Sequence, residues 1–189
     1  VQEEELVGLL QSGAESDRAF RILVSEYKER LYWHVRKIVL DHDDADDVLQ
    51  NTFVKVFKNI DKFKGDSKLY TWLYRIATNE ALTFIKKRAK QQRVTSEEVQ
   101  QLALSKLESD VYFEGDAIQL QLQKAIATLP QKQQLVFNMK YFEEHTYETL
   151  SEIWDTSVGR LKSKYHIAVK KNNELSNREW NLIKIIRSN

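Results

Sequence analysis

LPQKQQLVFNMKYFEEHTYETLSEIWDTSVGRLKSKYHIAVKK, residues 129–171, is the stretch that decides the fold. Asp155 and Thr156 are turn residues, and Ser157 can cap a helix that begins at Val158. Apolar side chains at intervals of three and four form one stripe on that helix: Val158, Leu161, Tyr165 and Ala168. The opposite side carries small or donor-bearing residues suited to contact with a polyanion: Gly159, Arg160, Lys162, Ser163, His166 and Lys170.

A shorter amphipathic helix is expected just before the turn, with its apolar side formed by Tyr147, Leu150, Ile153 and Trp154. Pro130 lacks an amide hydrogen and suits the first turn of a further helix upstream. A short helix, a tight turn and a helix with one basic face are typical of the helix-turn-helix, whose second helix enters the major groove of DNA. Another three-helix bundle with a solvated basic face explains the same residues and stays open as an alternative.

The composition favours an all-α protein. A chain of 189 residues suits one ordinary domain or two small ones, and five glycines and one proline are too few for a turn-rich all-β fold. The absence of cysteine excludes disulfides and thiolate metal sites and fits a reducing cytoplasm. No apolar run approaches the length of a membrane span, and the N-terminus is acidic where a signal peptide would be basic. We therefore expect a cytoplasmic protein.

Charge alternates along the chain. Residues 1–56 hold twelve Asp/Glu against seven Lys/Arg, whereas residues 58–93 hold ten Lys/Arg against three Asp/Glu. Residues 97–116 carry six acids and one lysine, and residues 160–171 carry five bases and no acid. Two basic blocks separated by acidic ones predict two contacts with a polyanion and at least one contact with a different partner.

The stretch 41–60, DHDDADDVLQNTFVKVFKNI, predicts a helix with an acidic first turn. Its outward side presents carboxylates and amides that suit docking of a basic partner protein: Asp46, Asp47, Gln50 and Asn51. Asp43, Asp44 and Asp47 also fit the pattern by which all-α prenyl-diphosphate enzymes hold magnesium. No second Asp-rich motif completes such a site, so a metal-free docking surface is the preferred interpretation.

The stretch 63–93, FKGDSKLYTWLYRIATNEALTFIKKRAKQQR, predicts a loop followed by a helix over 69–90. The helix can bury Leu73, Ile76, Ala77, Ala81 and Phe84. Cations, rings and an amide remain near the loop: Lys64, Lys68, Tyr70, Trp72, Tyr74, Arg75 and Asn79. A basic tail follows with Lys86, Lys87, Arg88 and Lys90. Aromatic rings beside cations suit single-stranded DNA, whose bases can stack on the rings. In the alternative interpretation, Trp72 and Tyr74 are core residues and the basic tail is a solvated helix end.

The predicted organisation is two small helical domains joined by a linker. Residues 1–92 form the first domain and residues 117–172 the helix-turn-helix domain. Residues 93–116 are polar and acidic and are expected to be a loosely docked linker, despite some helical potential around 99–107. Residues 173–189 are a C-terminal tail, either a last helix or disordered, with no assigned function.

This order of parts resembles a bacterial RNA polymerase sigma factor of the extracytoplasmic-function (ECF) class. The resemblance covers residues from about 14 to 171, including DADDVLQNTFVKVF, TWLYRIATNEALTFIKKR and the stretch quoted first. It implies that the chain binds core RNA polymerase and directs initiation at promoter DNA, without a cofactor, metal or small-molecule substrate. It also implies a cognate anti-sigma factor, which in this class often holds the protein at the inner membrane.

The resemblance assigns three sets of residues. Core polymerase would be bound by Asp46, Asp47, Gln50, Asn51 and Phe53. The minus-10 element would be captured and opened by Lys64, Ser67, Lys68, Tyr70, Trp72, Arg75, Asn79, Lys86, Lys87 and Arg88. The minus-35 duplex would be read by Ser157, Arg160, Lys162, Ser163, Lys164, His166 and Lys170. The sequence departs from the family at Asn51, Phe57, Leu69, Thr83 and Val169, where members often carry Glu, Trp, Phe, Asp and Arg.

Catalysis is not expected, because no nucleophile is accompanied by a base and an orienting partner. The alternative function is a helix-turn-helix regulator that binds duplex DNA as a dimer without polymerase. Such a regulator would need neither the acidic docking helix nor the aromatic loop.

Overall fold

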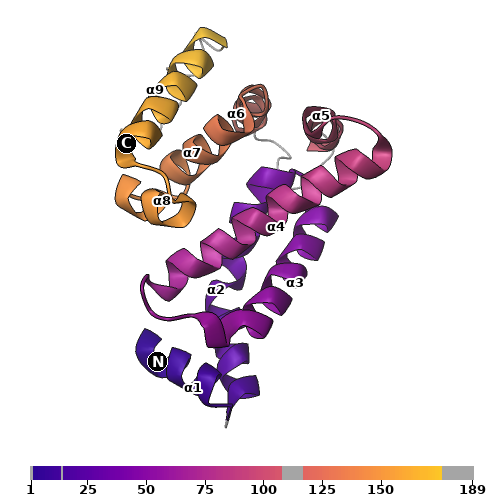
Figure 1. The fold of residues 1–189 in the computed structure, drawn as a ribbon. Coiled ribbons are helices and arrows are strands. Elements are labelled where there is room, and N and C mark those ends of the chain that lie inside the picture. The colour runs from indigo at the N-terminus through magenta and orange to yellow at the C-terminus, as the bar shows by residue number, and fades with distance from the viewer. Residues whose placement is uncertain (1, 14, 108–116, 176–189) are drawn as a thin grey trace. The chain divides into compact units, whose positions relative to one another are not determined.

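The computed structural model describes residues 2–13, 15–107 and 117–175, and every regular element in these residues is a helix (Figure 1). The all-α prediction is thereby confirmed. The chain divides into two compact units, Val1–Val99 and Gln100–Asn189. None of the helices described is long and apolar enough to cross a membrane.

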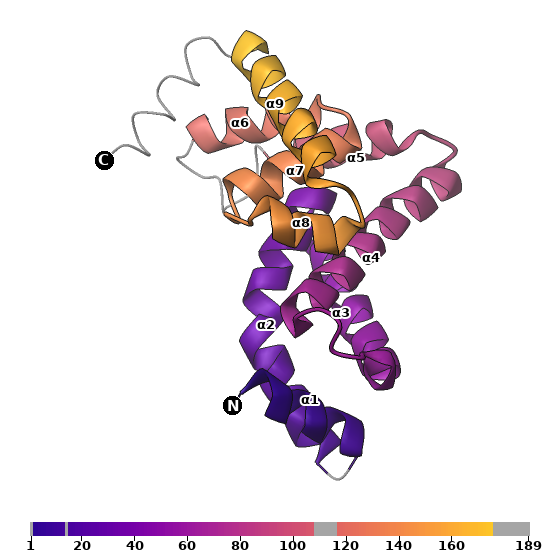
Figure 2. The ribbon, with the colours of Figure 1, turned by 60° about the vertical axis from the view of Figure 1, so that its left-hand side comes forward.

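The first unit contains α1 (Glu3–Ser12), α2 (Ser16–Val39), α3 (His42–Asn59), a short 3-10 turn η1 (Ile60–Lys62) and α4 (Leu69–Gln92). Helices α2, α3 and α4 pack against one another, and α1 packs on α2 (Figure 2). Their shared core includes fully buried aliphatic side chains at Leu23, Leu31, Val35 and Leu73. Helix α3 begins where the sequence predicts, because the Asp41 carboxylate accepts a hydrogen bond of 3.1 Å from the Asp44 amide.

A polar pair lies inside this core. The His34 ring nitrogen Nε2 and the Thr78 hydroxyl are 2.7 Å apart, and the Tyr74 ring centroid lies 4.8 Å from that of His34. Tyr74 is only 3% exposed, so the alternative that placed it in the core is confirmed for this residue. Helix α4 packs against both α2 and α3, and it therefore buries a wider arc than the single stripe counted from the sequence.

Part of the expected linker is helical. Helix α5 (Ser96–Lys106) begins with a capping box: the Glu98 amide donates to the Thr95 hydroxyl, and the Thr95 amide donates to the Glu98 carboxylate. These bonds lower the pKa of Glu98. The Gln100 side chain reaches Gln134 at 3.3 Å, so α5 is tied to the second unit. The rest of the predicted linker, 108–116, lies outside the described residues.

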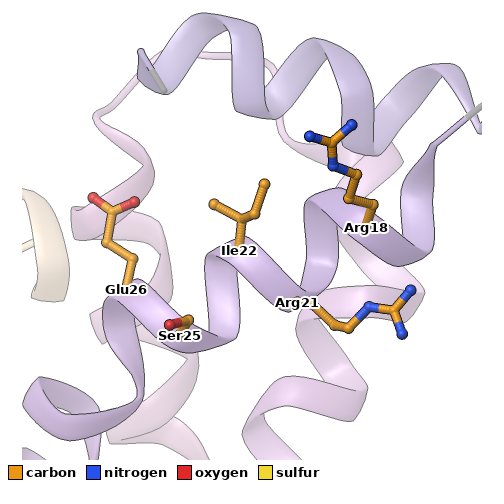
Figure 3. Close-up of a pocket in the computed structure, with 5 residues that line it drawn as sticks. All are labelled: Arg18, Arg21, Ile22, Ser25 and Glu26. Carbon is orange, nitrogen blue, oxygen red and sulfur yellow. The ribbon is translucent and has the colours of Figure 1, made fainter.

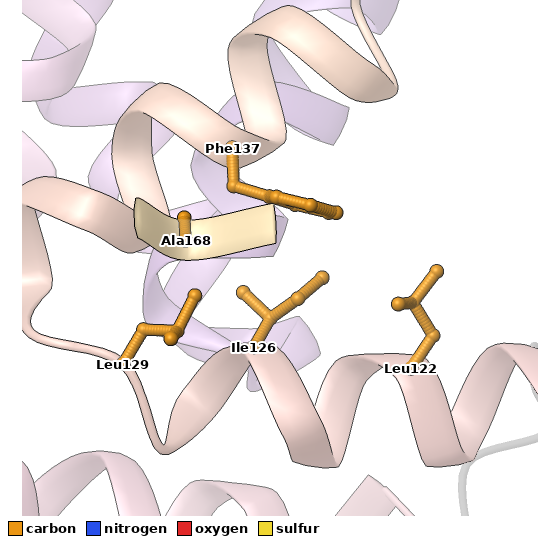
Figure 4. Close-up of a cluster of buried hydrophobic side chains, with 5 residues drawn as sticks. All are labelled: Leu122, Ile126, Leu129, Phe137 and Ala168. Atoms are coloured by element: carbon orange, nitrogen blue, oxygen red, sulfur yellow. The ribbon is translucent and has the colours of Figure 1, made fainter. Parts of the chain in front are cut away.

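The second unit also contains α6 (Ala117–Ala127), α7 (Gln131–Tyr141), α8 (Tyr147–Trp154) and α9 (Val158–Leu175). Buried side chains from α6, α7, α9 and the connection between α6 and α7 form its core: Leu122, Ile126, Leu129, Phe137 and Ala168 (Figure 4). Phe137 stacks on Tyr141 at 5.2 Å and on Tyr165 at 5.9 Å. Helix α9 continues into the segment predicted as a tail, of which 176–189 lie outside the described residues.

Candidate nucleic-acid and protein interfaces

Helices α8 and α9 are joined by the tight turn that the sequence predicts. The Thr146 hydroxyl caps α8 by accepting from the Thr149 amide, and Asp155 ends α8 in the left-handed conformation at φ 50°. Asp tolerates this conformation because its short side chain bonds locally. The Leu161 amide then donates to the Ser157 carbonyl at 3.1 Å, which starts α9. Together with the buried Leu150 and Leu161, this geometry confirms the helix-turn-helix.

The outward side of α9 presents the residues proposed to read a duplex. Six of them are exposed: Ser157, Arg160, Lys162, Ser163, His166 and Lys170. Lys164 is half-buried, at the edge of this surface. Gly159 belongs to the same side, and a Cβ atom built there would meet no atom within 4 Å. Sequence reasoning missed Ile167, which is 40% exposed and follows Ser163 by one helical turn.

Tyr147, the first residue of α8, lies near two cations. Lys140 Nζ lies 4.9 Å and Lys162 Nζ lies 5.7 Å from the centroid of its ring, distances at which a cation is attracted to the ring face. Burial raises the pKa of Tyr147, so its hydroxyl stays protonated at neutral pH. The exposed Lys162 is therefore held near α8 by its contact with the Tyr147 ring.

The loop before α4 carries the cations and rings proposed for single-stranded DNA. Its turn is made at Gly65, whose φ of 77° favours glycine. Exposed side chains here are Lys64, Lys68, Arg75 and Asn79, and half-buried ones are Ser67, Tyr70 and Trp72. Trp72 leans on Phe63 with 5.3 Å between ring centroids, and Tyr70 leans on Tyr74 at 4.4 Å. One side of each ring is therefore held by the core.

The basic tail of α4 is not brought to this loop. Fourteen residues separate Trp72 from Lys86, which is about 21 Å along a helix. Lys86 and Lys87 are exposed, but Arg88 forms an ion pair with Asp44 and lies 5.5 Å from the Phe84 ring. If Lys86 and Lys87 contact DNA, they do so at a different place from the loop proposed to capture a base.

The outward side of α3 carries the proposed docking residues. Asp47, Gln50 and Asn51 are exposed and Asp46 is half-buried. Phe53 is only 8% exposed and packs edge-on against Phe20 at 6.3 Å, so it supports the helix from within. Sequence reasoning missed two exposed apolar residues one and two turns further along, Val54 at 50% and Phe57 at 48% exposure. The i, i+3, i+4 spacing from Gln50 was a signal that could have found them.

The surface hollows of the described residues do not suggest a metal site. One of about 370 Å³ lies between α3 and α4, where the docking residues meet the α4 tail: Asp44, Asp47, Gln50, Asn51, Phe84, Lys87, Arg88 and Gln91. The pairing of Asp44 with Arg88 removes one of the three carboxylates of the magnesium pattern. Among the described residues no three His, Asp or Glu are grouped to hold a metal. A second hollow runs along α2 at Arg18, Arg21, Ile22, Ser25 and Glu26 (Figure 3).

Comparison with known proteins covers both units. Residues 23–91 match the family model of sigma-70 region 2, and residues 119–171 match that of sigma-70 region 4. The RNA polymerase sigma-H factor of Pseudomonas aeruginosa is 31% identical over 171 residues, which cover 86% of this chain and 88% of that protein. The ECF RNA polymerase sigma factor SigW of Bacillus subtilis is 31% identical over 156 residues, which cover 78% of this chain and 83% of that protein.

Two solved structures share the fold. CnrH, in complex with the cytosolic domain of CnrY, has a TM-score of 0.67 at 21% identity and covers 93% of this chain and 97% of its own. The sigma factor RpoE of Bartonella quintana, in complex with the anti-sigma factor NepR, has a TM-score of 0.64 at 21% identity and covers 84% and 97%.

Proposed function

Since this chain belongs to the sigma-70 family and is a sigma factor of the ECF class, which directs transcription initiation with RNA polymerase, we propose that its three exposed surfaces divide this work. The outward side of α3 docks on core polymerase. The loop before α4, with Tyr70 and Trp72, holds the opened minus-10 strand. Helix α9 lies in the major groove of the minus-35 duplex.

One observation carries this proposal. The chain places an exposed carboxylate and amide surface on α3 in one unit and an exposed cationic surface on α9 in the other. A protein partner with basic residues suits the first surface, and a phosphate backbone suits the second. The chain binds and positions, and we propose no covalent step. It acts in the cytoplasm, where promoter DNA is found.

An anti-sigma factor is proposed as a further partner. CnrH and the Bartonella quintana RpoE, which share this fold, were solved in complexes with CnrY and with the anti-sigma factor NepR. A partner of this kind that is anchored in the inner membrane would hold the chain there until it is released.

Reconstitution tests the proposed function. The chain is mixed with purified bacterial core polymerase and passed over a size-exclusion column, and the complex is then offered random-sequence DNA from which bound promoters are recovered. We expect stoichiometric co-elution and recovery of sequences with two conserved elements. Tight duplex binding by the free chain as a dimer, without polymerase, would instead support the regulator, which the match to sigma-70 region 2 does not favour.

A substitution at Arg160 distinguishes a contact with a base from a contact with a phosphate. Its side chain is exposed in the first turn of α9, the part of a recognition helix that meets base edges. We expect Arg160→Ala to weaken holoenzyme binding by about 1–3 kcal/mol and to relax selectivity at one minus-35 position. Binding of single-base promoter variants measures this. An equal loss on every sequence would identify Arg160 as a phosphate contact.

A further inference from the structure

The loop over residues 63–68 is anchored at its first end by α1. Gln11 Nε2 donates hydrogen bonds to the carbonyl oxygens of Ile60 at 3.0 Å and Phe63 at 2.8 Å. Ile60 is the first residue of η1 and Phe63 follows its last residue, so the two bonds span the turn that leads into the loop. Gln11 is 49 and 52 residues away in sequence, so these bonds are tertiary contacts.

The second end of the loop is anchored by the same helix. Leu69 is the first residue of α4, and its amide donates to the Glu3 carboxylate at 2.7 Å. Lys68, the residue at the cap position, makes no side-chain cap bond. Glu3 therefore supplies, from 66 residues away, an acceptor for one of the first-turn amides that have no partner within the helix.

Helix α1 is itself fixed in place. Leu6 and Leu10 are 2% and 4% exposed and hold one side of α1 against the unit. Glu3 and Gln11 are eight residues apart, about 12 Å along a helix, and contact the two ends of one loop. Between α1 and the loop lies a groove of about 440 Å³, with Val7 and Gly8 on one wall and Lys64, Ser67 and Lys68 on the other.

We propose that α1 is a functional part of the minus-10 site, in which Gln11 and Glu3 are positioning residues that fix the loop for capture of an unpaired base. This inference rests on the proposed function of the loop. The loop contains Gly65 and would otherwise sample many conformations, so that base binding would have to offset the loss of that freedom. The two contacts remove this cost before DNA arrives.

Near-isosteric changes at the two positions have opposite expected effects. Gln11→Glu replaces a donor with an acceptor and sets a carboxylate against two carbonyl oxygens, so the anchor is lost. Glu3→Gln keeps a carbonyl acceptor for the Leu69 amide, so the anchor is retained, whereas Glu3→Ala loses it. Glu5→Ala is the matched control, because Glu5 is exposed on α1 and does not line the groove. If Glu3 acted only through its charge, Glu3→Gln and Glu3→Ala would behave alike.

Two measurements are made on the full chain. Amide hydrogen exchange of the free protein reports opening of residues 64–69. The holoenzyme's binding to the single-stranded minus-10 segment of a promoter recovered with the wild type, and to single-base variants of it, reports base capture. We expect Gln11→Glu and Glu3→Ala to speed exchange and to lower minus-10 affinity roughly tenfold, with minus-35 duplex binding unchanged. Glu3→Gln and Glu5→Ala should match the wild type.

Either of two results would overturn the inference. Unchanged exchange in Gln11→Glu would show that α1 does not hold the loop. Faster exchange with unchanged minus-10 binding would show that the anchored conformation does not matter for base capture. A wild-type chain that fails to bind core polymerase would refute the proposed function, and with it the role in capture, while the exchange data would still show whether α1 anchors the loop.

Discussion

Replacing Asp47 and Gln50 together with lysine is expected to abolish co-elution of the chain with core polymerase. Both side chains are exposed on the outward side of α3, one turn apart, so they belong to a single contact surface. Lysine there places like charges against a basic partner, which costs several kcal/mol and lowers affinity by about a hundredfold or more. Exposed substitutions alter stability by about 0.5 kcal/mol or less, so the fold should persist.

A matched control separates docking from net charge. Ser25→Lys with Glu29→Lys makes the same change in net charge on exposed positions of α2. We expect this variant to co-elute with core polymerase, and thermal melting to give similar transitions for both variants. Lys87 and Arg88 lie in the same hollow as Asp47 and Gln50, so the melt also checks for repulsion within the chain. Co-elution of the Asp47 and Gln50 variant would exclude this side of α3 as the docking surface.

Local chemistry is what made much of this fold predictable. Apolar residues at intervals of three and four predicted α8 and α9, and turn residues at Asp155 and Thr156 separated them. The observed helices begin at Tyr147 and Val158. Ends of helices are decided by residues within one turn, which a sequence displays directly. The capping box that begins α5 was equally visible at Thr95 and Glu98, but the acidic composition around it was given more weight.

Tertiary contacts account for what the sequence did not show about several of these residues. Phe53 lies on the buried side of α3, although resemblance put it in the docking set, because Phe20 of α2 packs on it. Arg88, which the resemblance assigned to the minus-10 set, forms an ion pair with Asp44, 44 residues away. Gln11 and Glu3 gave no signal at all, since their partners are backbone groups of the distant loop. Periodicity describes one helix and cannot identify what packs against it.

Replacing Gly159 with glutamate is expected to stabilise the free chain and to abolish minus-35 binding. Glycine inside a helix is less favourable than other residues by up to about 1 kcal/mol, and a carboxylate in the first turn of α9 suits the positive end of the helix dipole. A Cβ atom at this position meets nothing in the free protein. On DNA the same side chain would face phosphates and base edges, with a loss of about a hundredfold or more in affinity.

The opposite signs of the two effects make this variant decisive for the orientation of α9. Any loss of DNA binding that came from a damaged fold would lower the melting temperature, whereas Gly159→Glu should raise it. Gly159→Ala is the control: it should stabilise the helix similarly and add only a methyl group, so that binding falls less than about tenfold. Holoenzyme affinity for a minus-35 duplex measures the difference. Wild-type affinity in Gly159→Glu would mean that DNA lies against a different side of α9, because a carboxylate that faced the phosphates would weaken binding.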